Sequence, residues 1–368
     1  MWKPLYLNVG SRLVPSSQRG KWLCTELQKA GPVYVKLGQF VSNRSDIFGS
    51  ISGDLKTLRD QVKPVEYSQV KDVLINCEGI VDIQEVPIAS ASISQIYLAR
   101  LKRNGRKVVA KVKRPGIEEK FQKDLGVIEN FLKIADKTLL DTFFNDFKTS
   151  LMNETDFVSE VKNIKTFEEI YSTSTSVIVP RVYPELSNDK LIVMDYVESS
   201  DRFTKPIFAE RLMNIFLQQI LFEGIVHGDL HGGNIGFTKD NKIVMYDFGN
   251  IIQLSQMYRD SIRELIQAIQ TKDPDRVYQV MKQMGMTINN EKETKMFIDG
   301  YLQYIDTVDV KSFSTVNFTS KIPVQFDKTT FQIIRTTGLV EGTCKDLNPT
   351  FSYQNSILLC IELIALGF

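Results

Sequence analysis

The spacing of apolar residues changes along this chain. At the start they recur every three or four positions, as on one face of a helix, over residues 17–30 and again from Val33 to Val41. From Val86 to Val112 they form strand-like runs, some alternating in steps of two. Further helices are predicted over residues 67–76 and 117–171, strands over 177–197, and helices beyond, apart from two short strands at 235–237 and 242–246.

One turn in the strand-rich part is well marked. Asn104 and Gly105 separate the apolar runs 95–101 and 108–112, and this dipeptide is a strong signal for a β-hairpin. Strands in the first half and helices in the second predict an α+β protein with two lobes. We place the boundary between them near Val197 to Lys205.

Composition narrows the class of protein. The 368 residues carry 45 Lys plus Arg and 44 Asp plus Glu, a net charge of +1, which argues against a general nucleic-acid binder. The four cysteines are scattered without a C-x-x-C pair, which predicts reduced thiols in a cytoplasmic or organelle-matrix setting. The N-terminus lacks the apolar region of a secretory signal. The apolar run 357–368 is shorter than the roughly 20 residues of a membrane span, so a buried terminal element is favoured over an in-plane membrane contact.

The densest chemical signal is the octapeptide His-Gly-Asp-Leu-His-Gly-Gly-Asn at residues 227–234, followed by Asp-Phe-Gly at 247–249. Both histidines of the chain lie within the octapeptide. Phosphoryl transfer needs a carboxylate to orient or deprotonate the acceptor and oxygen ligands for Mg²⁺. Asp229 suits the first role, and Asn234 with Asp247 suits the second. The spacing is that of a kinase catalytic loop and its metal-binding motif.

A kinase-like site also needs a lysine on an upstream strand and an acidic partner on a helix. Lys111, within Val-Val-Ala-Lys-Val, fits the lysine. The partner stays open among Glu154, Asp156 and Glu160, which we place on one helix.

Two further segments bear on the substrate. Where a protein kinase has a glycine-rich loop, this chain has Ala89, Ser90, Ala91 and Ser92, which predicts a stiffer phosphate-covering loop. Only residues 250–254 separate Asp-Phe-Gly from a helix that Ser255 can cap, and no Ala-Pro-Glu follows. Such a short segment argues against a peptide substrate.

Taken together, these motifs resemble the UbiB/ADCK family of atypical protein-kinase-like proteins. The resemblance runs from about Gly31 to Pro349 and includes Lys-Leu-Gly-Gln at 36–39, Arg-Pro-Gly at 114–116, Glu-Thr-Asp at 154–156 and Arg-Thr-Thr-Gly-Leu-Val-Glu-Gly at 335–342. It implies a bilobal protein-kinase-like fold, with a small N-lobe built on an antiparallel sheet, extra N-terminal helices and a mainly helical C-lobe. The implied domains are a helical extension at 1–85, an N-lobe at 86–200 and a C-lobe at 201–368.

The resemblance also implies roles for residues. Glu160 would pair with Lys111, and Lys36, with Gln39, would fold over the nucleotide cleft and engage Glu154 and Asp156. Besides these, the nucleotide-binding set would comprise Ala89, Ser90, Ala91, Ser92, Met194 and Val197.

Three functions remain open. The first is an ATP- and Mg²⁺-dependent ATPase or phosphotransferase acting on a small molecule or lipid; family members support isoprenoid quinone (coenzyme Q) biosynthesis and lipid homeostasis. The second is a nucleotide-gated, pseudokinase-type binding module for a lipid or protein partner, with ATP or ADP as ligand. The third is an aminoglycoside- or choline-kinase-like enzyme, which the Lys36 motif disfavours. The first two allow peripheral contact with a membrane, and no nucleic-acid partner is expected.

Overall fold

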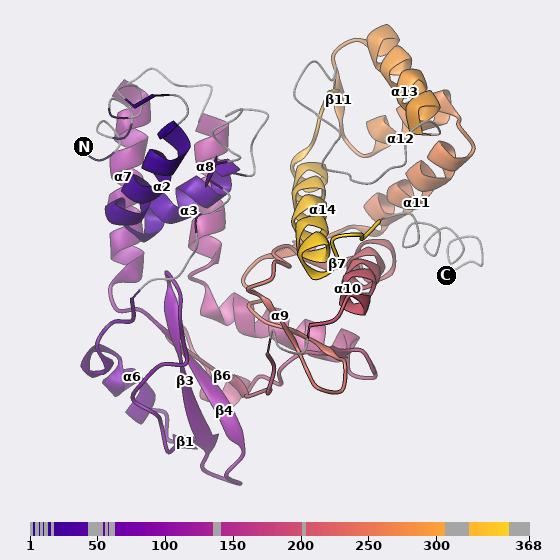
Figure 1. Ribbon diagram of the computed structural model, residues 1–368. Helices are drawn as coiled ribbons and strands as arrows, with labels where there is room; N and C mark the ends of the chain where they lie inside the picture. The colour runs from indigo at the N-terminus through magenta and orange to yellow at the C-terminus, as the bar shows by residue number, and fades with distance from the viewer. Residues whose placement is uncertain are drawn as a thin grey trace. The chain divides into compact units, whose positions relative to one another are not determined.

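The structure, a computed structural model, describes residues 18–42, 63–134, 141–200, 204–305 and 324–352, with a few single positions between residues 3 and 58. It divides into two compact units, the first comprising Met1–Glu168 with Pro180–Val197 and the second Glu169–Val179 with Glu198–Phe368. The first unit holds the larger antiparallel sheet, and the second is mainly helical (Figure 1). The predicted α+β class is confirmed.

The sheet of unit 1 determines the face on which the Lys111 side chain lies. Its strands run in the order β1-β3-β4-β6, and β2 pairs with β3. Alternate side chains of β3, β4 and β6, among them Tyr97, Ala110 and Val193, enter one apolar core. Lys111 lies between Ala110 and Val112 on β4, so its side chain leaves from the opposite face. The strands are β1 (Ile80–Val81), β2 (Ala89–Ser90), β3 (Ser94–Leu101), β4 (Lys107–Lys113) and β6 (Leu191–Asp195).

The predicted hairpin between β3 and β4 is confirmed. The two strands pair antiparallel from Ser94 with Lys113 to Arg100 with Lys107. Gly105 in the connection has a φ of 69°, a conformation that glycine adopts without steric cost.

A helical cluster forms a second core in unit 1. Helix α3 contacts α2, α7 and α8, and α7 contacts α8 (Figure 1). Their apolar faces bury Val33, Tyr34, Phe121 and Phe147. The helices of this unit are α2 (Arg19–Ala30), α3 (Pro32–Ser42), η2 (Tyr67–Gln69), α6 (Lys71–Ile75), α7 (Ile117–Ile134), α8 (Asp141–Asn153), η4 (Pro184–Leu186) and α9 (Phe157–Ile170), whose last two residues belong to unit 2.

Unit 2 is built on helices that side chains cap. Ser255, Asp273 and Asp327 each accept a hydrogen bond from the first turn of the helix that follows. The cap at Ser255 was predicted and is confirmed. The helices are α10 (Ile207–Gln218), the π-helical turn η6 (Gln219–Glu223), α11 (Gln256–Gln270), α12 (Pro274–Gln283), α13 (Glu291–Ile305) and α14 (Lys328–Leu347).

The short strands of unit 2 correct the sequence-based prediction. β5 and the pair near residues 235–246 were predicted, and the structure adds β7, β10, β11 and β12. Two or three residues are too few to show an alternating pattern, so these strands were assigned to helices or loops. The strands are β5 (Val177–Ile178), β7 (Ile225–His227), β8 (Ile235–Phe237), β9 (Ile243–Met245), β10 (Ile251–Gln253), β11 (Thr287–Ile288) and β12 (Val324–Gln325).

A second correction concerns the segment with the three candidate acids. We predicted one helix through residues 154–160, whereas α8 ends at Asn153 and α9 begins at Phe157. Glu154 and Asp156 therefore lie in the turn between two helices, and Glu160 lies in the first turn of α9.

No helix in the described ranges is both long and apolar enough to span a bilayer. The apolar run 357–368 lies outside the described residues, so its predicted burial is still a prediction. The same holds for the predicted domain boundaries at residues 85 and 200.

Candidate functional site

Lys111 and Glu160 form a buried ion pair in unit 1. The Lys111 ammonium lies 2.7 and 2.9 Å from the two carboxylate oxygens of Glu160. Their side chains are 9% and 2% exposed. Phe157, one turn before Glu160, places its ring 5.4 Å from the ammonium. Of the three candidate acids named from the sequence, Glu160 is the one that the structure brings to Lys111.

Lys36 pairs with a different acid. Its ammonium lies 2.8 Å from Glu154, and both side chains are partly buried. Gln39, one turn further along α3, donates from Nε2 to the carbonyl oxygen of Leu58 at 3.3 Å. The structure therefore links the two motifs that the sequence analysis associated, through Lys36 and Glu154.

Asp156 caps the start of α9. Its carboxylate accepts hydrogen bonds from the Ser159 hydroxyl at 2.6 Å and from the Ser159 amide at 2.9 Å. These bonds, the side-chain one above all, hold the pKa of Asp156 below its ordinary value. The structure thus gives this acid a helix-capping contact.

The cap predicts a pH-dependent contribution to stability. A carboxyl whose folded pKa is lowered stabilises the fold above its unfolded pKa of about 3.9, and the contribution is lost as pH falls through the folded pKa. Asp156→Asn keeps an acceptor for Ser159 but does not titrate. We expect the parent to have a larger unfolding free energy than Asp156→Asn at neutral pH. This difference should shrink as pH falls below about 4. Urea unfolding at pH 7, 4.5 and 3 measures this difference. Asp189→Asn, at an exposed aspartate, is the control. A difference that grows on acidification would contradict the prediction.

Arg114 makes hydrogen bonds to the loop at residues 89–92, the Ala/Ser loop. The guanidinium donates to the carbonyl oxygen of Ala91 at 2.9 Å and to the Ser90 hydroxyl at 2.7 Å. Arg114 is 8% exposed and Ser92 is 1% exposed, so the loop is tied to the body of unit 1. From the sequence, Arg114 was recognised only as part of a motif, with no role assigned to it. Its signal was the Arg-Pro-Gly directly after the Lys111 strand.

The last strand of the sheet contains Met194, which is paired with Val109 on β4 and 8% exposed. Asp195 follows it and accepts from the Tyr183 hydroxyl at 2.7 Å and from Arg106 at 2.7 Å. Val197 lies two residues beyond the end of this strand and is partly buried. The side chain of Asp195 is thus taken up by structural contacts.

The catalytic-loop octapeptide begins at the end of β7 in unit 2. His227 is fully buried; its Nε2 lies 3.0 Å from the carbonyl oxygen of Tyr246, and its Nδ1 accepts from the Asp229 amide at 3.2 Å. These contacts place the proton on Nε2. Burial lowers the pKa of His227, so the ring is neutral near pH 7 and acts as a structural support for Asp229.

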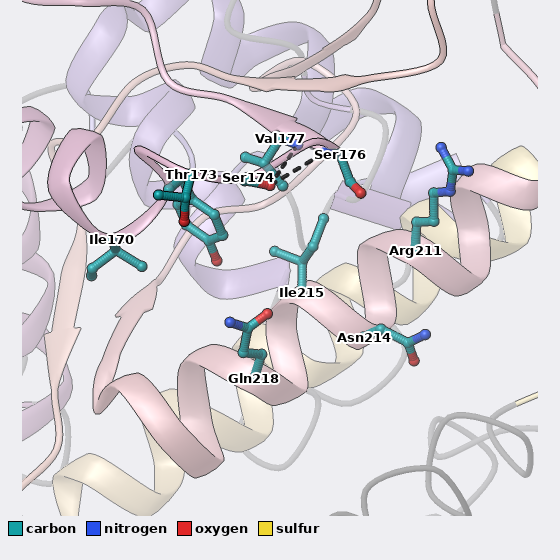
Figure 2. A pocket seen from close by; sticks show the side chains of 10 residues that line it. Ile170, Thr173, Ser174, Ser176, Val177, Arg211, Asn214, Ile215 and Gln218 are labelled. Carbon is teal, nitrogen blue, oxygen red and sulfur yellow. Dashed lines mark hydrogen bonds between the residues drawn. The ribbon is translucent and has the colours of Figure 1, made fainter. Parts of the chain in front are cut away.

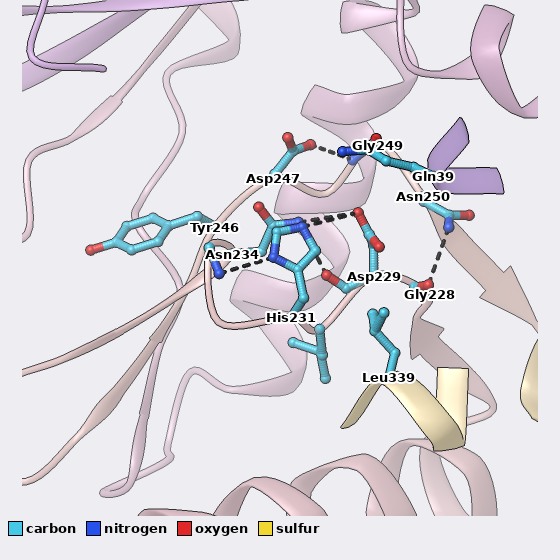
Figure 3. Close-up of polar contacts among 12 residues, drawn as sticks. Gln39, Gly228, Asp229, His231, Asn234, Tyr246, Asp247, Gly249, Asn250 and Leu339 are labelled. Carbon is cyan, nitrogen blue, oxygen red and sulfur yellow. Dashed lines mark hydrogen bonds and ion pairs between the residues drawn. The ribbon is translucent and has the colours of Figure 1, made fainter. Parts of the chain in front are cut away.

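Asp229 and Asn234 contact each other within the loop (Figure 3). The Nδ2 of Asn234 donates to the backbone oxygen of Asp229 at 3.1 Å and to its carboxylate at 3.3 Å. His231 Nε2 lies 3.6 Å from the same carboxylate, and its Nδ1 accepts from the Gly233 amide at 2.9 Å. Because Nδ2 makes these bonds, the amide oxygen of Asn234 is the end that can face a cation.

Asp247 lies beside this pair. The amide of the preceding Tyr246 donates to the carbonyl oxygen of Asn234 at 2.8 Å, and the Gly249 amide donates to the Asp247 carboxylate at 3.3 Å. Asp247 has a φ of 54°, in the left-handed region that few residue types other than glycine, asparagine and aspartate enter readily.

The donor set near Asp247 fits Mg²⁺. Mg²⁺ is commonly held by one or two carboxylates together with substrate phosphates and water. Asp247 with the amide oxygen of Asn234 supplies such a set, whereas the described residues contain no group of three or more His, Cys, Asp or Glu side chains that could hold a metal alone.

Unit 2 also contains a cavity of about 370 Å³ between α10 and residues 170–177 (Figure 2). Arg211, Asn214 and Gln218 of α10 line it. None of the candidate site residues lies among its lining residues, so the cavity does not include the catalytic loop.

Three features are typical of a kinase-like protein: a buried strand lysine paired with a helix glutamate, an Asp and an Asn on the catalytic loop, and the Asp of a following Asp-Phe-Gly. Residues 57–281, more than half of the chain, match the model of the ABC1 atypical kinase-like domain. The chain belongs to this family, which confirms the resemblance drawn from its sequence.

Named relatives agree with this assignment. The chain is 31% identical over 296 residues to the Arabidopsis thaliana protein ACTIVITY OF BC1 COMPLEX KINASE 8, chloroplastic, covering 73% of this chain and 39% of that protein. It is 29% identical over 294 residues to a probable protein kinase UbiB of Shewanella baltica, covering 72% of this chain and 54% of the relative. The chain thus spans about half or less of the length of these relatives.

A solved structure supports the fold. The complex of Rv3197 with erythromycin from Mycobacterium tuberculosis aligns with a TM-score of 0.56 at 20% identity, covering 94% of this chain and 98% of that chain. The likeness confirms the predicted kinase-like fold.

Proposed function

We propose that this protein binds ATP or ADP with Mg²⁺ and either hydrolyses ATP or transfers its terminal phosphoryl group to a small molecule or lipid. The observation that carries the proposal is the buried Lys111–Glu160 ion pair, because kinases require this pair to hold a lysine for the nucleotide phosphates. Stability alone does not explain this ion pair, because apolar residues of similar size often stabilise a core equally well.

The candidate site residues would have separate roles in the reaction. Lys111 would contact the phosphates, and Asn234 with Asp247 would hold Mg²⁺, which offsets phosphate charge when bound. Asp229 would accept the proton of the attacking hydroxyl or water as its oxygen bonds to the γ-phosphorus and the bond from that phosphorus to the β–γ bridging oxygen breaks. His231 and Asn234 keep the Asp229 carboxylate oriented.

The segment after Asp247 favours a small acceptor. Only Asn250 separates Gly249 from β10, which pairs with β7 in the register Ile251 with His227, and α11 follows at Gln256. Protein kinases use a longer segment here to lay out a peptide. A lipid or quinone precursor is our proposed acceptor, in keeping with the family resemblance to UbiB proteins.

ADP formation from ATP by purified protein tests the proposal, because hydrolysis and transfer to an acceptor both produce ADP. We expect turnover that requires Mg²⁺, stops with EDTA and falls in Asp229→Asn, and we expect anionic vesicles to raise it if the acceptor is a lipid. Turnover that Asp229→Asn leaves unchanged would belong to a contaminant and would refute the proposal.

The nucleotide-gated binding module is kept as a second candidate because Arg114 fixes the Ala/Ser loop and Lys36 is joined to Glu154. It predicts nucleotide-dependent vesicle or partner binding that survives Asp229→Asn but not Lys111→Ala. An absence of turnover, with ATP still raising the melting temperature, would favour it.

A further inference from the structure

Helix α14 contacts the catalytic loop from outside the matched family domain. The domain match ends at residue 281, whereas α14 spans Lys328–Leu347. Three of its side chains lie within hydrogen-bond distance of loop carbonyls, and these carbonyls belong to Gly228 and Leu230, the two neighbours of Asp229. The three side chains are Arg335, Thr336 and Thr343.

Arg335 makes the principal contact. Its Nη2 donates to the carbonyl oxygen of Gly228 at 3.0 Å. Thr336 reaches the same oxygen at 3.3 Å, but its single hydroxyl proton also has the Gln332 carbonyl at 2.9 Å within its own helix. The guanidinium has five donors and a fixed charge, so its bond does not compete with helix contacts.

The bond from Arg335 is one of several that hold the peptide unit between Gly228 and Asp229. The Gly228 carbonyl also accepts from Asn250 Nδ2 at 3.2 Å, and the amide of the same peptide, that of Asp229, donates to His227 Nδ1 at 3.2 Å. A peptide unit is planar, so holding both its oxygen and its amide sets the orientation of the whole unit. Asp229 begins at this unit, and its carboxylate direction depends on it (Figure 3).

The helix that carries Arg335 is itself anchored at both ends. At its start the Asp327 carboxylate accepts from the Thr329 amide at 2.9 Å, and the hydroxyls of Tyr258 and Thr330 lie 2.5 Å apart. Near its end the Cys344 thiol donates to the Ala209 carbonyl of α10 at 3.2 Å. These contacts fix the register of α14 and hence the position of Arg335.

We propose that Arg335 is a positioning residue for the proposed reaction: from α14 it holds the Gly228–Asp229 peptide, with Thr336 in support, and so aims the Asp229 carboxylate. The inference rests on the proposed role of Asp229. It assigns a role in turnover, and none in nucleotide binding, to a helix outside the matched family domain.

Kinetics of Arg335→Met, Arg335→Lys and Thr336→Val test the proposal. A misplacement near 1 Å can cost about 100-fold in rate, so we expect Arg335→Met to lower kcat roughly 10- to 100-fold while the KM for ATP changes less than about twofold. Arg335→Lys keeps a cationic donor and should recover part of kcat. Thr336→Val should lose less, because its hydroxyl has the closer partner in the helix.

Arg211→Met is the matched control. Arg211 also makes one guanidinium bond to a backbone oxygen, that of Asn241 at 2.7 Å, but on the turn between β8 and β9. Both methionine variants should lose some thermal stability, and only Arg335→Met should lose kcat per folded molecule. Equal kcat losses in the two variants, or a kcat within twofold of the parent for Arg335→Met, would overturn the proposal.

Amide hydrogen exchange separates this inference from the proposed function. In Arg335→Met we expect the Asp229 amide to exchange at least roughly tenfold faster than in the parent, with no such change in Arg211→Met. This measurement needs no turnover. Absent turnover in the parent would refute the proposed function alone, whereas unchanged Asp229 exchange in Arg335→Met would refute the positioning role.

Discussion

Asp247→Asn is expected to lower Mg²⁺-dependent ATP hydrolysis by about 100-fold or more, the usual scale for removing a charge that stabilises the transition state. The substitution suits the site. Asparagine tolerates the left-handed conformation that Asp247 adopts, with its φ of 54°, and its amide oxygen can still accept from the Gly249 amide. The variant should therefore fold as the parent does and lose only the charge that would hold the metal.

Two measurements make this result decisive. The melting temperature without nucleotide should match that of the parent, and the concentration of Mg²⁺ for half-maximal rate should rise in the residual activity. Asp299→Asn, an exposed aspartate on α13, is the matched control and should retain full activity. Full activity in Asp247→Asn would remove Asp247 from the metal site.

The sequence shows the residue types and spacing of the octapeptide loop, whose contacts join residues close along the chain, while its chemistry is still a prediction. Asp229 and Asn234 are five residues apart and meet within one turn of chain. The types and spacing of these residues were enough to recognise the loop from eight residues of sequence. The same is true of the hairpin at Gly105, where one glycine with positive φ sets the turn.

The partner of Lys111 was harder to predict from the residues alone. Glu154, Asp156 and Glu160 lie within seven residues, and an unbroken helix through them would have offered no reason to choose. The break between α8 and α9 separates them, so that Glu154 contacts Lys36 and Glu160 contacts Lys111. Resemblance to a family supplied the pairing that periodicity could not.

The role of Arg335 could not be predicted in this way. Its contact with Gly228 joins residues 107 positions apart, and neither residue type signals the other. Arg114 is similar, since its contacts with the Ala/Ser loop depend on how β2 and β4 flank β3. Such long-range contacts follow from packing, which only the folded chain defines.

Lys111 and Glu160 allow stability and function to be separated in one set of variants. Removing one member of a buried ion pair leaves the other charge uncompensated and costs about 3 to 5 kcal/mol, while replacing both is often nearly neutral. We expect Lys111→Met to lower the urea-derived unfolding free energy by about that amount, because Glu160 stays 2% exposed without this counter-charge. Glu160→Gln should cost less, since an amide can still accept from the lysine.

The double variant Lys111→Met with Glu160→Gln should recover much of the lost unfolding free energy, yet ATP with Mg²⁺ should no longer raise its melting temperature. That combination is what a phosphate-binding lysine requires, because stability returns once no unpaired charge is buried while the cation for the phosphates is still missing. Lys295→Met, on the surface of α13, serves as the control for losing a lysine. If the double variant regained both stability and the ATP-dependent shift, Lys111 would be a structural residue and the proposed nucleotide site would lose its main support.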